Sequence, residues 1–266
     1  MTTGAVIFAY NNDQIDYLAL ARWSASNINR HLNIPTAIVT NQEFTAQAHE
    51  RCILAQTTGN NRRYFSDYDT NVKWHNTNRM DAYNLSPWDR TMVIDADYVV
   101  ASGQLKVMLD SNLEFVCHRQ AYDITGLSNF ADLNVFGLNN MPMSWATVMI
   151  FDRCLQAKLI FDMMAMIRDN WDYYKQLYHN TSPSYRNDHA LSIALNTVNG
   201  HTLDYTAMPW NLASLTPGHK LECTGQDQYC VNYVTPQGRR QYIEIADQDF
   251  HAMGKQQLGE IVASYS

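Results

Sequence analysis

The chain has 266 residues, which fits one large α/β domain or a domain and a half and is enough to bury a sizeable core. Hydrophobic residues make up 46% of it and charged residues 17%, a balance that argues against an extended disordered region. The net charge is −7 at pH 7, so long-range electrostatics disfavour bulk attraction to nucleic acid or to an anionic membrane.

The cysteines and the N-terminus favour a reducing, aqueous compartment. The five cysteines are odd in number and include no C-x-x-C pair, so neither a disulfide framework nor a thiolate zinc site is indicated. Residues 1–4 lead directly into an apolar run without a basic and apolar leader, and no run reaches transmembrane length. We therefore expect a soluble, unprocessed, cytoplasmic protein with no membrane segment, a class that includes viral proteins acting in a host cytoplasm.

The first forty residues predict a strand, a helix and a second strand. Residues 5–9 form a continuous apolar run, which is typical of a strand buried on both faces. From residue 15 to residue 32, apolar side chains recur at steps of three and four, which predicts a helix with one buried stripe. Residues 36–40 then predict the second strand. This βαβ unit is right-handed by default.

The same alternation continues along the chain. Further strands are predicted at residues 52–55, 91–94, 114–118, 146–151 and 202–205, and helices at residues 79–85, 153–178 and 188–196. Residues 57–78 are predicted to form a long loop, and residues 209–249 a turn-rich tail. The pattern indicates a single Rossmann-like α/β domain with a mostly parallel central sheet flanked by helices.

Asp95 and Asp97 carry the clearest chemical signal. They follow the predicted strand at residues 91–94, and ligands of open α/β sheets bind outside the carboxyl ends of strands. Two carboxylates one residue apart can offer oxygens to a hard cation such as Mn²⁺ or Mg²⁺, which also binds substrate phosphates. Asp-x-Asp is a common string, but its place after a strand favours ligands over a solvated turn.

Five segments spread over nearly the whole chain carry a resemblance to a known family. They are VIFAYNND, VIDADYVV, TVMIFD, NDHALSIALN and FHAMGK. Together they resemble the GT-A class of nucleotide-sugar glycosyltransferases, most closely the glycogenin-like and lipopolysaccharide galactosyltransferase-like group. The resemblance implies one GT-A domain over residues 1–266, in which residues 1–100 form the nucleotide-binding half ending in Asp-x-Asp and residues 101–266 the acceptor- and sugar-binding half.

The resemblance also implies an activity and a set of site residues. The activity is metal-dependent transfer of a hexose from a nucleotide diphosphate sugar to an acceptor hydroxyl, with retention of configuration. A UDP-sugar is the first candidate for the donor. Metal ligands for Mn²⁺ or Mg²⁺ would be Asp95, Asp97 and His251, and Asp188 would contact the donor sugar or the reacting centre. Residues that hold the nucleotide diphosphate would be Ala9, Tyr10, Asn11, Arg79, Asp95, Ala96, Asp97 and Lys255.

Simpler roles stand beside some of these assignments. Tyr10 could cover the end of the sheet, Arg79 could be a solvated helix charge, and Asp188 could cap a helix.

Two departures from the group leave the donor sugar and the nucleotide base open. Its N-A-G-V strand entry is Trp145-Ala146-Thr147-Val148 here, and its H-x-x-G-x-x-K-P-W ending is reduced to residues 251–255, where Lys255 is the candidate substitute for the lysine.

The acceptor stays open among a glycan, a protein side chain and a hydroxymethylated base in DNA. Residues 62–79 interleave basic and aromatic side chains, which can bind phosphates, stack on bases or sugar rings, or form a lid. For DNA, the candidate groove consists of Arg62, Arg63, Lys73, Arg239 and Arg240.

Two other classes of protein compete with a transferase. A haloacid-dehalogenase-like phosphatase would use Asp95 as nucleophile and Asp97 as general acid, although that motif normally opens its fold. A catalytically silent nucleotide-sugar-binding module would keep the cavity without the reaction.

Overall fold

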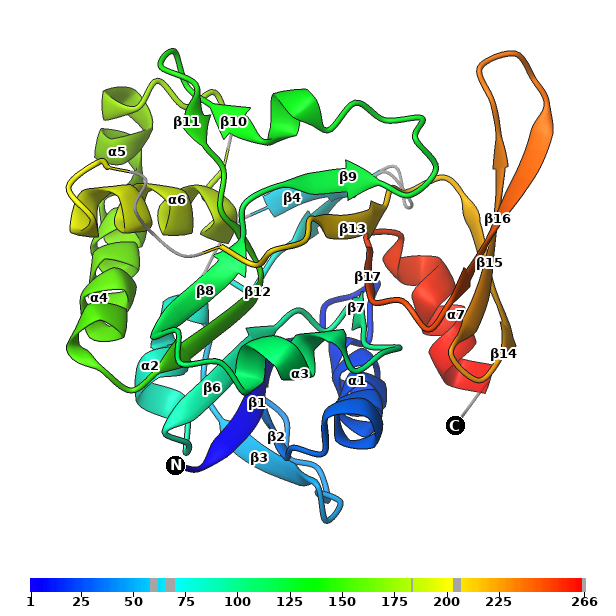
Figure 1. The fold of residues 1–266 in the computed structure, drawn as a ribbon, viewed down its shortest axis with the longest axis horizontal. Helices are drawn as coiled ribbons and strands as arrows, with labels where there is room; N and C mark the ends of the chain where they lie inside the picture. Colours follow the sequence, from blue (N-terminus) through cyan, green and yellow to red (C-terminus); the bar gives the residue numbers. More distant parts are fainter. Residues whose placement is uncertain (58–61, 66–69, 183, 203–206, 265–266) are drawn as a thin grey trace.

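The structure, a computed structural model, describes residues 1–57, 62–65, 70–182, 184–202 and 207–264. Within these residues six strands form a central sheet in the order β3-β2-β1-β6-β12-β8 (Figure 1). Their bounds are β1 Thr3–Phe8, β2 Thr36–Thr40, β3 Glu50–Leu54, β6 Arg90–Ile94, β8 Phe115–His118 and β12 Trp145–Asp152. β12 runs antiparallel to both of its neighbours, and the other five strands share one direction. The predicted mostly parallel α/β sheet is therefore confirmed.

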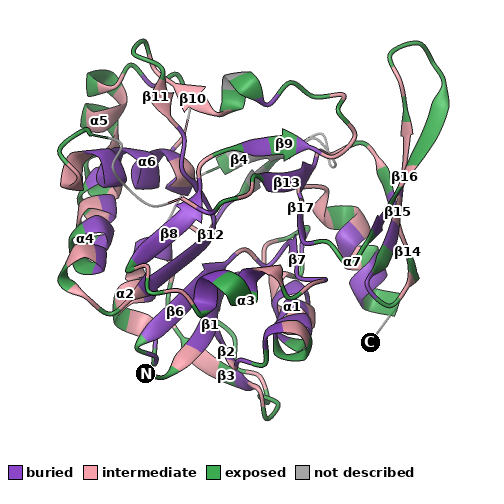
Figure 2. Cartoon of the chain, in the orientation of Figure 1, coloured by how far each residue is buried: buried purple, intermediate pink, exposed green. Residues whose placement is uncertain are grey.

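Helices cover both faces of this sheet, as its buried strands require (Figure 2). Because side chains alternate along a strand, Ala5 and Ile7 of β1 face one core and Val6 and Phe8 face the other. The first core takes α1 (Tyr17–Leu32), α3 (Gln104–Leu109) and α7 (Lys255–Ser264); the second takes α2 (Ala82–Leu85), α4 (Leu155–Asp169) and α6 (Asn187–Val198). The sheet is thus a rigid layer whose strand ends can carry a site.

A smaller sheet brings the C-terminal part of the chain to the end of β6. Its order is β7-β17-β13-β9, with β7 Tyr98–Val99, β9 Ala121–Asp123, β13 Leu212–Leu215 and β17 Phe250–Ala252. β17 pairs antiparallel with β7, so that His251 lies opposite Tyr98. The backbone N–H of Ala252 also donates to the carbonyl oxygen of Asp97 at 2.9 Å. Residues about 150 positions apart in sequence therefore meet next to Asp-x-Asp.

The prediction of one continuous helix over residues 153–178 is wrong, because this segment forms two helices. The chain forms α4 and then α5 (Trp171–Leu177), with a break at Asn170. The backbone of Asn170 leaves the helical conformation, with φ −120° and ψ 36°, and its Nδ2 donates to the carbonyl oxygen of Met166 at 2.9 Å. This break was not visible in the hydrophobic spacing, which continues across it.

Two segments predicted without regular structure contain strands. In the predicted loop, β4 (Arg62–Phe65) pairs with β5 (Thr70–Lys73). In the predicted turn-rich tail, β14 (Lys220–Gly225), β15 (Gln228–Val234) and β16 (Arg240–Ala246) form an antiparallel sheet that projects from the body of the protein (Figure 1). The residues that indicated turns do form turns, but these turns join the strands of hairpins. Asp227 and Gly238, with positive φ values of 55° and 76°, lie between these strands.

The remaining elements are short. They are the 3₁₀ turns Arg79–Asp81 and Ala131–Leu133 and the strand pair β10 (Val135–Phe136) and β11 (Met141–Pro142). The strand predicted at residues 202–205 lies mostly outside the described residues. Among the described helices, none combines the length and the apolar character that crossing a membrane needs.

Close packing at the start of β1 yields a test of the fold. A Cβ added to Gly4 would lie 2.3 Å from Cε2 of the buried Trp88 ring, so Gly4→Ala forces this ring to shift. We expect a loss of roughly 1–3 kcal/mol in the free energy of unfolding, measured by urea denaturation. The matched variant is Gly259→Ala in α7, where nothing lies within 4 Å of the added Cβ and better helix propensity should stabilise by roughly 0.5–1 kcal/mol. Equal stability of the two variants would contradict this packing.

Candidate functional site

A cavity of about 540 Å³ lies at the carboxyl ends of β1 and β6. β1 contributes Phe8 and leads to Tyr10, and β6 leads to Asp95, Ala96 and Asp97. Later parts of the chain contribute Trp145, Thr147, Arg186, Asn187, Asp188, Pro217, His251, Met253 and Lys255. Its location is the one at which open α/β sheets bind ligands, and its volume suits a small-molecule ligand.

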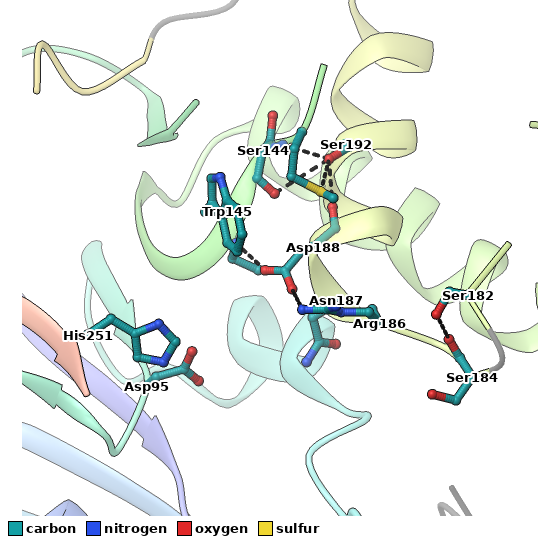
Figure 3. A network of polar contacts seen from close by, with 12 residues as sticks. Asp95, Ser144, Trp145, Ser182, Ser184, Arg186, Asn187, Asp188, Ser192 and His251 are labelled. Carbon is teal, nitrogen blue, oxygen red and sulfur yellow. Dashed lines mark hydrogen bonds and ion pairs between the residues drawn. The ribbon is translucent and has the colours of Figure 1, made fainter. Parts of the chain in front are cut away.

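Asp95, Asp97 and His251 form a cluster that could hold a metal ion. One potential ligand atom from each of the three lies within 4.8 Å of the others. The backbone N–H of Asp95 donates to Thr147 at 2.9 Å, which fixes the loop after β6, and Figure 3 shows the side chains of Asp95 and His251 side by side. Nδ1 of His251 is buried and has no hydrogen-bond partner among the described residues. Two carboxylates and an imidazole with a spare nitrogen suit a divalent cation.

Asp97 is held as a carboxylate by two neighbouring basic groups. Burial alone would raise its pKa, but the charge of Lys255 and then that of His251 lower the pKa well below its usual range. Nζ of Lys255 lies 2.5 Å from Oδ2 of Asp97, and Nε2 of His251 lies 3.4 Å from the same oxygen. Lys255 is the first residue of α7, so this helix delivers an ammonium group to the cluster.

Arg79 is a buried partner of Asp95 rather than a solvated helix charge. Only 4% of the residue is exposed. Its guanidinium forms an ion pair with Asp95 and donates to the carbonyl oxygen of Ala146 in β12. Burial lowers the pKa of Arg79, while Asp188 and Asp97 act in the opposite direction. Arg79 therefore ties the Asp-x-Asp loop to the neighbouring strand from inside the protein.

Asp188 lies in the first turn of α6, and its side chain does not cap the helix. Instead, Oδ1 accepts a hydrogen bond from the backbone N–H of Ala146 at 3.0 Å, and Oδ2 lies 3.4 Å from a guanidinium nitrogen of Arg186. Burial raises the pKa of Asp188, but Arg186 and the Ala146 N–H outweigh that effect and lower it. The group that faces the cavity is thus an anchored carboxylate.

Ser192 locks α6 onto the start of β12. Its hydroxyl accepts a hydrogen bond from the backbone N–H of Ser144 at 2.7 Å and donates one to the carbonyl oxygen of Asp188 at 2.7 Å (Figure 3). Since Asp188 in turn binds Ala146, two successive links join the helix and the strand. The position of Asp188 is therefore set by backbone contacts on both sides.

The residues expected around the nucleoside divide into two groups. Tyr10 lines the cavity, and burial raises the pKa of its hydroxyl to about 12, with a smaller contribution from Asp81. Ala96 lines the cavity as well. Ala9 and Asn11 are not among the described lining residues: the N–H of Ala9 donates to Val39 in the sheet, and the amide of Asn11 binds Leu18 and Asp16 at the start of α1.

Sequence reasoning missed several lining residues. Arg186, Asn187, Ser182, Ser184, Tyr17, Pro217 and Met253 line the cavity without having been selected. Arg186 and Asn187 directly precede Asp188, so the neighbourhood of that residue was the available signal. From the basic and aromatic stretch, Arg62, Asn71, Trp74, His75 and Asn76 line the cavity.

Few of the basic residues considered for a DNA groove line this cavity. Arg62 lines it from β4, whereas Lys73, Arg239 and Arg240 are not among its described lining residues, and Arg240 belongs to the separate sheet β14-β15-β16. The side chain of Arg63 lies outside the described part of the chain.

No protein-family model matches the chain, and no curated protein matches it. Among solved structures, it is similar to the apo-form glycosyltransferase GlyE of Streptococcus pneumoniae TIGR4, with 15% identity and a TM-score of 0.43 over 78% of this chain and 45% of that one. It is also similar to the galactosyltransferase LgtC in complex with donor and acceptor sugar analogs, with 13% identity and a TM-score of 0.45 over 72% of this chain and 70% of that one. The chain thus spans less than half the length of GlyE.

The buried pair of Arg79 and Asp95 yields a test of the site's construction. Arg79→Met leaves Asp95 and the carbonyl oxygen of Ala146 without their cationic partner, so we expect a loss of about 3 kcal/mol in the free energy of unfolding. Lys158→Met is the control because Lys158 pairs with Asp162 on the surface, and it should leave urea denaturation unchanged. If both variants unfold at the same urea concentration, Arg79 is not the internal link described above.

Proposed function

We propose that the chain is a metal-dependent glycosyltransferase that takes a sugar from a nucleotide diphosphate sugar. The observation that carries the proposal is the cluster of Asp95, Asp97 and His251 inside a cavity at the carboxyl edge of the sheet. The donor set fits Mn²⁺ or Mg²⁺, which bind carboxylates together with substrate phosphates. When bound, such a cation would stabilise the negative charge that develops on a diphosphate leaving group.

The basic groups around the cavity support a diphosphate rather than an uncharged ligand. Arg62, Arg79, Arg186 and Lys255 line it, against the carboxylates Asp95, Asp97 and Asp188. Arg79 and Lys255 each contact one of the two Asp-x-Asp carboxylates, so both cations lie at the metal cluster. A phosphate oxygen near that cluster would therefore meet ammonium or guanidinium donors, which form strong charge-assisted hydrogen bonds.

In the proposed reaction, the bond between C1 of the sugar and the diphosphate oxygen breaks while the acceptor oxygen bonds to C1. The acceptor proton leaves with the diphosphate. Asp188, anchored by Ala146, is suited to accept hydrogen bonds from donor-sugar hydroxyls next to the reacting carbon. Tyr10 is suited to contact the base of the nucleotide. We propose a UDP-sugar carrying a hexose as the donor, and retention of configuration.

Both halves of the chain would contribute to this one site. Residues 1–100 supply Tyr10, Arg79, Asp95 and Asp97, and residues 101–266 supply Asp188, His251 and Lys255. We therefore propose that they act as a single glycosyltransferase domain. Trp74, His75, Ser182 and Ser184 line the cavity and are the candidates for the acceptor side, where a glycan, a protein side chain or a hydroxymethylated DNA base would bind.

Metal-dependent donor binding tests the proposal. We expect UDP-glucose or UDP-galactose to raise the melting temperature in the presence of Mn²⁺ and not in the presence of EDTA. Asp97→Asn and His251→Ala should each weaken Mn²⁺ binding by at least about tenfold in isothermal titration calorimetry, because each removes a ligand of the cluster. Asp110→Asn is the control, since Asp110 is an exposed residue paired with Lys106 at the end of α3.

The enzymatic readout separates the competing functions. A transferase should release UDP slowly from its donor in Mn²⁺ without acceptor and should not hydrolyse p-nitrophenyl phosphate. Hydrolysis of that ester, abolished by Asp95→Asn, would favour the haloacid-dehalogenase-like phosphatase. Donor binding with no release of UDP, even with acceptor mixtures, would favour the silent binding module. Unchanged Mn²⁺ binding in Asp97→Asn would overturn the metal site itself.

A further inference from the structure

We propose that a second cavity, on the outer side of α1, binds a neutral oligosaccharide. This cavity has a volume of about 720 Å³ and shares no described lining residue with the candidate active site. It lies between α1, the turn that joins β14 and β15, and α7, which contacts both α1 and β14. The proposal does not require the transferase activity proposed above, and it concerns a different surface of the chain.

One face of α1 forms the wall of this cavity. Arg22, Trp23, Asn27 and Arg30 recur at the spacing of one helix face, and all four line it. The opposite side is supplied by Gln226 and Asp227 of the hairpin and by Val262 of α7, among others. The helix thus presents a planar aromatic ring, an amide and two guanidinium groups to a single cavity. On most solvent-facing helix surfaces, such groups point into open solvent.

The charges of this wall are internally balanced. Nε of Arg22 pairs with Oε1 of Glu50 at 3.3 Å, and the Glu50 side chain is only 1% exposed. Arg30 pairs with Asp227, whose side chain is 8% exposed and also lies 3.1 Å from Nε2 of His31. Two guanidinium groups thus face two carboxylates, so the hollow offers little net attraction to an anion. A phosphate or sulfate ligand would compete with carboxylates that are already in place.

The polar groups that remain suit hydroxyls. A guanidinium carries five N–H donors, and one carboxylate cannot occupy all of them. Asn27 is 3% exposed, and its Nδ2 has no hydrogen-bond partner among the described residues, although buried amide donors are normally paired. The amides of Gln47 and Gln226 add both donors and acceptors. Sugar hydroxyls can donate and accept, so a polyol can satisfy this mixed set without bringing a charge.

The ring of Trp23 and the size of the cavity favour several sugar rings over a single small polyol. Trp23 is partly exposed, lines the cavity and packs against the first core, so its indole is held in place. A fixed aromatic face gives a large contact area at low entropic cost and matches the C–H face of a sugar ring. A volume of 720 Å³ is in the range of sites for multi-ring ligands.

The test measures binding of a neutral glucose hexasaccharide, maltohexaose, and a neutral β1,4-linked galactose hexasaccharide by calorimetry and saturation-transfer NMR. We expect wild-type protein to bind at least one of them, and Trp23→Ala to weaken binding by about tenfold or more through loss of the ring contact. Trp23→Phe should retain part of the affinity. Ser26→Trp, at an exposed position that lines the cavity, should block binding without altering the core.

Two control proteins make the outcome specific. Tyr242→Ala removes an aromatic ring that is 66% exposed on β16 and should bind as the wild type does. Asp97→Asn should keep hexasaccharide binding while losing Mn²⁺-dependent donor binding, so that failure of this proposal and failure of the proposed transferase are distinguishable. The inference is overturned if neither neutral hexasaccharide binds, if only a sulfated hexasaccharide binds, or if Ser26→Trp binds as the wild type does.

Discussion

The pairing of β17 with β7 is the constraint on which the candidate site depends. Asp95 and Asp97 occupy a loop whose place is set locally by the end of β6, but His251 reaches them only because the chain returns to form β17. The backbone N–H of Ala252, the residue after His251, donates to the carbonyl oxygen of Asp97, so the two backbone segments lie side by side. Lys255 follows within one turn of α7 and contacts the same carboxylate. One short antiparallel pair therefore delivers both an imidazole and an ammonium group to Asp-x-Asp.

Burying charged groups beside one another is costly, and stability alone does not explain this arrangement. An apolar set of similar volume would be at least as stable as an ion pair in many buried sites. Lys255 instead holds the pKa of the buried Asp97 carboxyl low, and Arg79 forms an ion pair with Asp95 beside it. Perturbed ionisable groups concentrate where charged ligands bind, so these pairs, besides linking the loop to its neighbours, suit the cation and phosphate of the proposed function.

The sequence predicts those parts of the fold and site that depend on neighbours in the chain. The βαβ start and the position of Asp-x-Asp after a buried strand follow from local spacing, and both are confirmed. A solvated helix charge stood beside the diphosphate role for Arg79 because its carbonyl partner, Ala146 in β12, is far away in sequence. Residues 220–246 looked like turns because short alternating strands give a weak signal, and their pairing is what makes them a sheet. The break at Asn170 is a change of backbone conformation, to φ −120° and ψ 36°, that hydrophobic spacing cannot register.

Trp145 decides what kind of selectivity the proposed donor pocket can have. Its indole Nε1 donates to Asn134 at 3.3 Å, and Asn134 is itself bound to the backbone of Ala121 through both its oxygen and its nitrogen. The ring also packs against Phe130, so it forms a fixed wall. A wall of this kind discriminates sugars by shape and apolar contact, which separates close analogues by only about 10–200-fold, because it leaves no buried polar group unpaired when a hydroxyl is missing. Selectivity among sugars in the proposed pocket would then depend on the remaining polar contacts, above all those of Asp188.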